Sequence, residues 1–198
     1  MTSVDEDAKK SRAIIGHVSA TPELFATIFN ASVSKAPSED IDVAIFAINP
    51  SAGIDQPTID AWRECDDLQI PRIVIVTVLE GMEMDFDDAV LVANRVFDPL
   101  VTPYLVLHGE SGTPIGTISL SDLTTTDYST TPPTLSHADE ELAEMVKEFQ
   151  EEFQNSMMEM DDDAFSAGIL FPAIPINPSN GLGIDIVNRY LSALPSRG

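Results

Sequence analysis

Residues 11–24 have the layout of a phosphate-binding loop, in which a short apolar strand leads into a glycine and then into a helix. A working loop of this kind reads G-x-x-x-x-G-K-[ST]: backbone N–H groups surround the phosphates, the lysine neutralises them and the hydroxyl holds Mg²⁺. Counting from Gly16, the second glycine is replaced by Thr21, the lysine by Pro22 and the hydroxyl residue by Glu23. Pro22 has neither a positive charge nor an N–H donor, and Glu23 puts negative charge where phosphate would lie. The loop therefore lacks the residues that bind phosphate.

Several further segments follow this loop in a recognisable order. They are Gly-His-Val-Ser-Ala at 16–20, a continuous stretch at 41–86 that runs into Met-Asp-Phe-Asp at 84–87, Gly-Thr-Ile-Ser-Leu-Ser-Asp at 116–122 and a closing helix with its Leu-Pro-Ser at 183–196. In this order they resemble the G domain, with its insert subdomain, of the elongation factor G family of translational GTPases. The resemblance implies an α/β fold of three layers, with a mostly parallel sheet of the P-loop GTPase type and a small α+β insert.

The other nucleotide-binding motifs of that family have no counterpart here. The two switch segments, including the Asp-x-x-Gly that binds Mg²⁺ through water, are replaced by the short connection 34–40. The guanine-reading Asn-Lys-x-Asp becomes the run from Thr77 to Glu80, and the Ser-Ala that supports the base becomes Asn177-Pro178. Phosphoryl transfer depends on positioning and on charge. We therefore expect no catalytic residue, no nucleotide, no metal and no other cofactor in this domain.

These losses predict a catalytically inactive GTPase-like domain, a pseudo-GTPase, that acts as a scaffold or binding module linked to translation. The alternative is a domain that still binds GTP or GDP through a remodelled pocket. The chain also ends where the family's G domain passes into its second domain. We expect further domains beyond Gly198 in the intact protein, although a free-standing remnant is the other possibility.

The charge of the chain excludes several kinds of partner. A net charge of −23, with only ten lysines and arginines, opposes binding to nucleic acid or to an anionic membrane surface. The single cysteine, Cys65, excludes an internal disulfide and suits a reducing compartment. The polar N-terminus lacks the apolar region of a signal peptide, and no apolar run is long enough to span a bilayer. Together these features predict a cytoplasmic protein.

Residues 11–100 alternate short apolar strands with amphipathic helices, which is typical of a parallel sheet covered on both faces. We expect strands at 13–18, 41–48, 72–79 and 169–176, and helices at 22–34, 55–68, 84–97 and 182–193. Thr21 and Pro22 suit the N-cap and first position of the first helix. Because the lost switch region includes the family's outer strands, the strand at 13–18 should form an edge that invites pairing or needs cover from the N-terminal segment.

The pattern divides the chain into a disordered tail at 1–10, a degenerate G domain at 11–100 and 169–198, and an insert subdomain at 101–168. Within the insert, a strand at 101–107 should pair with the segment 115–120. Residues 124–137 are rich in Thr, Ser and Pro and read as a long loop or a mobile strand. A helix at 138–160 should follow.

This insert helix carries two distinct faces. Apolar residues at helical spacing predict a stripe that faces the helix's own sheet: Leu142, Met145, Val146, Phe149 and Phe153. The remaining face is acidic and carries Glu141, Glu144, Glu148, Glu151 and Glu152. It is either a plain solvated surface or a docking surface for a basic protein. The family resemblance implies the C-terminal domain of the ribosomal stalk protein, whose helices are rich in lysine.

The remaining reactive side chains do not combine into a site. His17, His108 and His137 form no zinc-ligand spacing with Cys65. The adjacent carboxylates of 161–163 point in different directions and lack the spacing of cation ligands.

Overall fold

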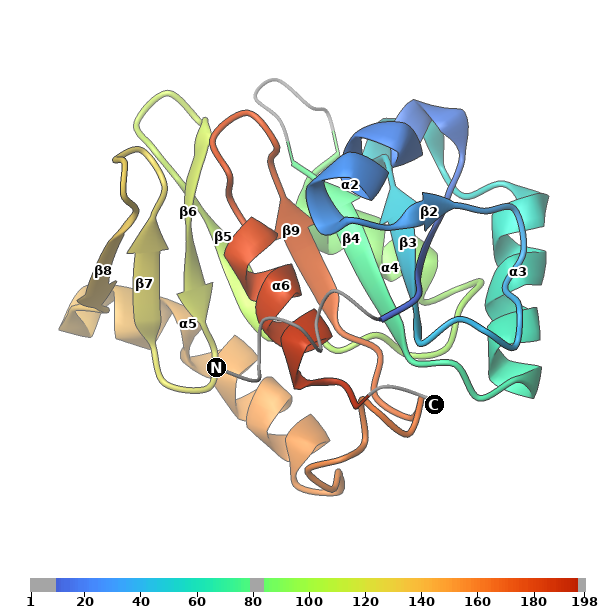
Figure 1. Ribbon diagram of the computed structural model, residues 1–198. Helices are drawn as coiled ribbons and strands as arrows, with labels where there is room; N and C mark the ends of the chain where they lie inside the picture. The colour runs from blue at the N-terminus through green and yellow to red at the C-terminus, as the bar shows by residue number, and fades with distance from the viewer. Residues whose placement is uncertain (1–9, 79–83, 196–198) are drawn as a thin grey trace, which may run out of the picture.

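The computed structural model describes residues 10–78 and 84–195 and contains two β-sheets, one parallel and one antiparallel (Figure 1). The parallel sheet has the strand order β2-β1-β3-β4-β9. Its strands are β1 (Arg12–Ile15), β2 (Ser32–Val33), β3 (Val43–Ile48), β4 (Arg72–Thr77) and β9 (Ala173–Ile176). Every residue of β3, β4 and β9 is buried, as expected for apolar, largely β-branched strands that are covered on both faces. The predicted α/β class with a mostly parallel sheet is confirmed.

Helices cover both faces of this sheet and give three layers. They are α2 (Pro22–Phe29), α3 (Gln56–Asp67), α4 (Phe86–Ala93) and α6 (Ile184–Ala193). Phe46 of β3 points to one face and packs with Trp62 of α3. Ile45, its neighbour, points to the other face and shares a core with Phe25 of α2 and Val187 of α6. The alternation of β3 thus separates two hydrophobic cores, one under α3 and α4 and one under α2 and α6.

The antiparallel sheet has the order β5-β6-β7-β8 and lies beside β9 (Figure 1). Its strands are β5 (Tyr104–His108), β6 (Pro114–Ser119), β7 (Thr124–Asp127) and β8 (Thr134–His137). Helix α5 (Glu140–Met157) covers one face, where Val146 packs with Ile118 and Leu120. The predicted pairing of 101–107 with 115–120 is confirmed by β5 and β6, which pair through Leu105 and Ile118.

Residues 124–137, expected to be a long loop or a mobile strand, are not a continuous loop, because β7 and β8 form a hairpin there. Thr125 and Ser136 lie opposite each other, and their hydroxyl oxygens are 2.6 Å apart. Four of the residues in β7 and β8 are threonine, which favours strands because it branches at Cβ. The content of Thr, Ser and Pro concealed this strand signal.

The first helix is also shorter than predicted. It ends at Phe29 rather than at residue 34, because Asn30 adopts the left-handed conformation with φ of 48°. The chain then forms β2, which pairs in parallel with β1 through Ser32 and Val33. The expectation that the strand at 13–18 forms the sheet edge is therefore wrong. A two-residue strand covers it, and such a short edge strand offers little to an intruding chain.

Other element boundaries differ from expectation by a few residues. Helix α4 ends at Ala93, before the predicted 97, and β9 begins at Ala173 rather than at 169. Ala164 and Phe165 lie within the predicted insert range of 101–168 but pack on the parallel sheet, next to Leu170. The N-terminal tail predicted at 1–10 lies outside the described residues, except for its last residue.

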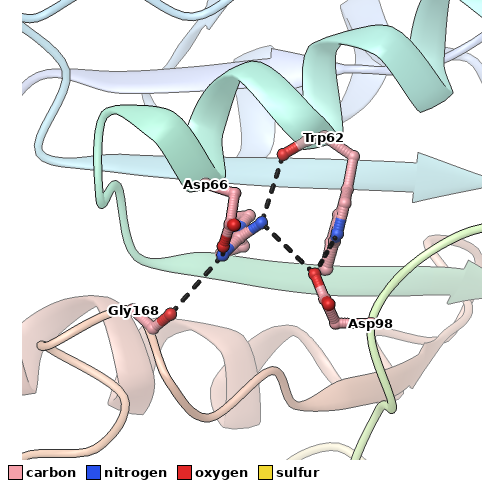
Figure 2. Close-up of polar contacts among 5 residues, drawn as sticks. Trp62, Asp66, Asp98 and Gly168 are labelled. Atoms are coloured by element: carbon pink, nitrogen blue, oxygen red, sulfur yellow. Dashed lines mark hydrogen bonds and ion pairs between the residues drawn. The ribbon is translucent and has the colours of Figure 1, made fainter.

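A buried arginine connects α3, the chain after α4 and the segment before β9 (Figure 2). Arg72, the first residue of β4, has a fully buried side chain. It donates hydrogen bonds to the carbonyl of Trp62 at 3.1 Å, to the carboxylate of Asp66 at 2.8 Å and to the carbonyl of Gly168 at 3.4 Å. Asp98 lies 3.8 Å away and also accepts a hydrogen bond from the Trp62 indole at 2.9 Å. Four separate parts of the chain thus meet at one guanidinium group.

Aromatic rings enclose the same group. The Arg72 guanidinium carbon lies 4.6 Å from the centre of the Trp62 ring and 4.2 Å from that of Phe171. Trp62 also stacks on Phe97, with ring centres 4.2 Å apart. Trp62 thus serves the packing of the core around Arg72. Cation–π contacts of this kind stabilise a charge that has lost its water.

Candidate functional site

The loop between β1 and α2 starts at a position where only glycine fits. A Cβ atom at Gly16 would lie 2.5 Å from the carbonyl oxygen of Ala47, on the neighbouring strand β3. That distance is far below van der Waals contact. Gly16 is therefore required by the close approach of two backbones, which is a structural reason independent of any phosphate.

Three consecutive N–H groups of this loop are bonded inside the loop. Residues 18–20 form a short 3₁₀ helix, η1 (Val18–Ala20), with His17 at its N-cap. The Ser19 N–H donates to Nδ1 of His17 at 3.2 Å. The N–H of Ala20 donates to the His17 carbonyl at 2.9 Å, and that of Thr21 to the Val18 carbonyl at 3.1 Å. A phosphate-binding loop needs such groups to point at the ligand, and here they point at the loop itself.

The first residues of α2 also differ from those of a phosphate-binding loop. Pro22, at the first helical position, is buried and has no N–H to donate. Glu23 follows in the first turn with an exposed side chain. Thr21 occupies the predicted N-cap position, but it adopts φ of 50° and its side chain caps nothing. The helix start is stabilised by proline and by the backbone turn, and the predicted side-chain cap is wrong.

The hollow behind the loop is filled. Asn49, which follows β3, donates from its amide to the Ser19 carbonyl at 2.9 Å and accepts from the Ser51 N–H at 3.0 Å. The space lined by His17, Ala20 and the end of β3 admits no water-sized sphere. The loop is thus held against β3 by an asparagine, in the place where an open phosphate site would leave room.

The predicted base-binding positions lie at the ends of β4 and β9. Thr77 closes β4 and is buried, and Asn177 follows β9 and is buried too. The Asn177 side-chain oxygen accepts from Ser179 N–H at 2.9 Å, and its carbonyl accepts from Gly181 N–H at 2.9 Å. Asn177 therefore organises the turn that contains the half-buried Pro178. Glu80, the other predicted position, lies outside the described residues.

Helix α5 presents its acidic face to solvent. The side chains in question are all exposed: Glu141, Glu144, Glu148, Glu151 and Glu152. Lys147 lies 3.8 Å from Glu144, and both side chains are more than half exposed, so this ion pair contributes little. The helix begins with Asp139, whose carboxylate accepts from the Leu142 N–H at 2.9 Å. An acidic first turn and this cap both suit the positive end of the helix dipole.

The apolar stripe of α5 only partly faces its sheet, contrary to prediction. Val146 is buried and Leu142 and Phe153 are half-buried, but Met145 is 70% exposed and Phe149 is 47% exposed. The helix is rotated so that its sheet-facing side is centred on Val146, and the other two residues lie at the border with the acidic face.

A groove that the sequence did not reveal lies between α4 and α5. Its volume is about 270 Å³, and Val90 and Leu91 of α4 face Phe149 and Phe153 of α5 across it. Asp87 lies at the rim, where burial and the neighbouring Asp85 and Asp88 raise the pKa of its carboxyl. The sequence indicates this groove only through Leu91, an apolar residue outside the buried face of α4. In the structure Leu91 is 60% exposed. Exposed apolar residues thus border the acidic face of α5.

Within residues 10–78 and 84–195, no three His, Cys, Asp or Glu side chains lie together in a way that could hold a metal ion. Cys65 lies on the buried face of α3, and burial raises the pKa of its thiol to about 12. The side chains of 161–163 are exposed. No helix in this part of the chain is long and apolar enough to cross a membrane.

Two curated proteins, both named elongation factor G-like protein, are similar to this chain. They come from two Mycobacterium tuberculosis strains, CDC 1551 / Oshkosh and ATCC 25618 / H37Rv. Each is 27% identical over an alignment of 177 positions that covers 78% of this chain and 24% of the relative. The chain therefore spans about a quarter of the length of these relatives. No protein-family model matches it.

A solved structure has the same fold. A crystal structure from Thermus thermophilus superposes with a TM-score of 0.68 at 23% identity, over 80% of this chain and 27% of that chain. The similarity in sequence supports a relationship to elongation factor G-like proteins. The similarity in structure supports the fold, a shortened GTPase-like domain with an insert.

Proposed function

We propose that this chain is a GTPase-like domain, related to elongation factor G, that does not bind or hydrolyse GTP and acts as a binding module linked to translation. One observation carries the proposal. The N–H groups of Ser19, Ala20 and Thr21 are bonded inside the loop, and Pro22 has none. A phosphate would have to break these bonds and meet the Glu23 carboxylate, with no lysine to offset the repulsion.

Nucleotide-dependent stability tests this proposal. The melting temperature is measured with GDP, GTP or ATP and Mg²⁺ at rising concentration, next to a translational GTPase with intact motifs. A ligand present at 100 times its Kd adds about 2.7 kcal/mol, which raises the melting temperature of a domain of this size by about 5–10 °C. We expect the control to rise and this protein to stay constant. A saturable rise with GDP or GTP would instead support a remodelled nucleotide pocket.

Restoring the loop residues gives a second arm. The triple variant Thr21→Gly, Pro22→Lys, Glu23→Thr recovers the consensus of a phosphate loop. It should still not bind GTP, because the base-reading positions Thr77 and Asn177 are buried and hold other contacts. GTP binding by this variant would show that the loop alone has been lost.

The binding-module role needs a surface, and we place it on the acidic face of α5. Its five glutamates stand on one exposed helix beside the apolar Met145 and Phe149. A lysine-rich partner would be attracted by these charges and would find apolar contacts at their border. The C-terminal domain of the ribosomal stalk protein is the first candidate.

The charge of this face can be reversed without touching the core. The variant Glu144→Lys, Glu148→Lys, Glu151→Lys should abolish binding of the stalk domain, measured by calorimetry at low salt. Binding by the parent should weaken as salt rises, because the Debye length falls from about 10 Å at 0.1 M to about 3 Å at 1 M.

A matched control makes the same charge change elsewhere. Glu39→Lys, Glu64→Lys, Asp67→Lys alters three exposed carboxylates, and two of them lie on α3, across the molecule from α5 (Figure 1). This control should retain binding. Equal loss in both variants would mean that net charge alone matters, and unchanged binding by the α5 variant would leave its acidic face a solvated surface.

A further inference from the structure

Another hollow lies away from the loop and from α5. It has a volume of about 520 Å³ and separates the β7–β8 hairpin from the start of α6. Thr126, Tyr128 and Leu135 form one wall, and Ile184 and Asp185 belong to the other. The Tyr128 hydroxyl connects the two walls, because it donates to the Asp185 carboxylate at 2.6 Å. We call this hollow the α6 cleft.

Strand β8 forms the outer edge of the antiparallel sheet and borders this cleft (Figure 1). All four of its residues are exposed. The Ala138 N–H donates to the Leu123 carbonyl at 2.9 Å. This bond shows which residues of β8 make backbone hydrogen bonds to β7 and which do not. In an antiparallel ladder every second residue bonds to the neighbouring strand. The backbone groups of Ser136 and Thr134 therefore point to β7, and those of Leu135 and His137 point outward.

The chemistry of the cleft matches one kind of side chain. Leu135 is 69% exposed. Leu135 and Ile184 give the cleft an apolar lining, and Asp185 lines the same cleft. The Asp185 side chain is 53% exposed, and its second oxygen lies 3.8 Å from Arg189. A lysine or arginine can lay its aliphatic stem on an apolar surface and place its charge at a carboxylate beyond it.

We propose that β8 binds an extended basic peptide segment of another protein by strand addition, with a lysine or arginine side chain inserted into the α6 cleft. Backbone bonds to Leu135 and His137 hold the segment, and the ion pair with Asp185 selects its side chain. A second copy of this chain fits poorly as the occupant, because each copy carries a net charge of −23. The proposal is independent of the acidic face of α5.

The probe is a short synthetic peptide in which lysine and threonine alternate, and its control is the same peptide with glutamate in place of lysine. Amide resonances of the protein are followed by NMR during titration. The lysine peptide should shift the amides of Leu135 and His137 and protect them from hydrogen exchange, while the glutamate peptide should not. Shifts confined to α5, or no change at these two amides, would overturn the proposal.

Three variants separate the contribution of the backbone hydrogen bonds from that of the ion pair with Asp185. Leu135→Pro removes an outward N–H but no ladder bond, so the fold is kept and binding is lost. Leu135→Ala keeps that N–H and should weaken binding less. Asp185→Asn still accepts the Tyr128 hydroxyl but lacks the charge, and should weaken binding about tenfold.

The charge-reversed α5 variant serves as the control and should bind the lysine peptide at β8 as the parent does. Should Leu135→Pro fail to fold, amide protection and Asp185→Asn decide the matter. Undiminished binding by Asp185→Asn contradicts the inserted cation. A dimer in sedimentation that Leu135→Pro dissociates would assign the edge to a second copy and overturn the proposal.

Discussion

Replacing Arg72 by methionine and by lysine tests whether this buried cation holds the domain together by geometry or by charge. Its guanidinium is fully buried, yet the carboxylates of Asp66 and Asp98 that face it are 64% and 49% exposed. Without Arg72 these two carboxylates can be hydrated, so no buried charge is left unpaired. The main cost of removing Arg72 is therefore the loss of its hydrogen bonds to the Trp62 carbonyl and to Asp66.

The magnitude follows from these contacts. Charge-assisted hydrogen bonds and the two cation–π contacts contribute a few kcal/mol, and the desolvation of Arg72 opposes them. Methionine has no charge to desolvate and fits between the Trp62 and Phe171 rings, so Arg72→Met should lower the free energy of unfolding by about 2 kcal/mol. Lysine keeps a strongly hydrated charge and cannot reproduce the planar fork. Arg72→Lys should therefore cost more, about 3–4 kcal/mol.

Urea unfolding followed by fluorescence measures both values, since Trp62 is the single tryptophan and contacts Arg72 directly. Arg63 on the same helix is the control. It is 68% exposed and lies 3.7 Å from Asp60, so Arg63→Lys should change stability by less than about 0.5 kcal/mol. The reasoning is refuted if Arg72→Lys is as stable as Arg72→Met or more so, because positive charge alone would then suffice.

Two other predictions concern Gly16, at the start of the loop, and Cys65, on the buried face of α3. Gly16→Ala should lower the free energy of unfolding by about 1–3 kcal/mol, because its Cβ would clash with the Ala47 carbonyl. Gly109→Ala is the control and should be nearly neutral, because its Cβ would meet its nearest atom at 3.4 Å. Thermal unfolding of both variants measures the difference. Burial raises the pKa of the Cys65 thiol to about 12, so the folded state holds this proton more tightly than the unfolded state. Stability from this group is complete below about pH 9 and is lost as pH rises toward 12, and Cys65→Ala should flatten that alkaline decline in urea titrations; an unchanged slope would contradict the assignment.

The parallel sheet could be predicted because its signal is local. Runs such as 43–48 and 72–77 are short, apolar and rich in β-branched residues, and turn signals bound them. Arg72 is the exception within such a run, and nothing local indicates that it is buried. Its burial depends on Asp66, Asp98 and Phe171, which meet it only in the folded chain.

The missed features depend on neighbours that the sequence does not place. Asn30 ends α2 in a left-handed conformation, which a period-based prediction passes over. Met145 and Phe149 fit the helical spacing, but which part of a wide stripe is covered depends on the size of the sheet beneath it. The interpretation of the loop was easier to reach, because Pro22 and Glu23 differ by residue type alone from the lysine and hydroxyl residue of the consensus. The internal bonds of that loop required the structure.

The loop amides offer the most direct test of the central claim. Hydrogen exchange and chemical shifts of Ser19, Ala20 and Thr21 are recorded by NMR with and without excess GDP and Mg²⁺. We predict slow exchange of all three amides, because each is already bonded within the loop, and no shift on adding GDP. Fast exchange in the free protein, or a saturable GDP-dependent shift of these amides, would contradict the loss of the phosphate site.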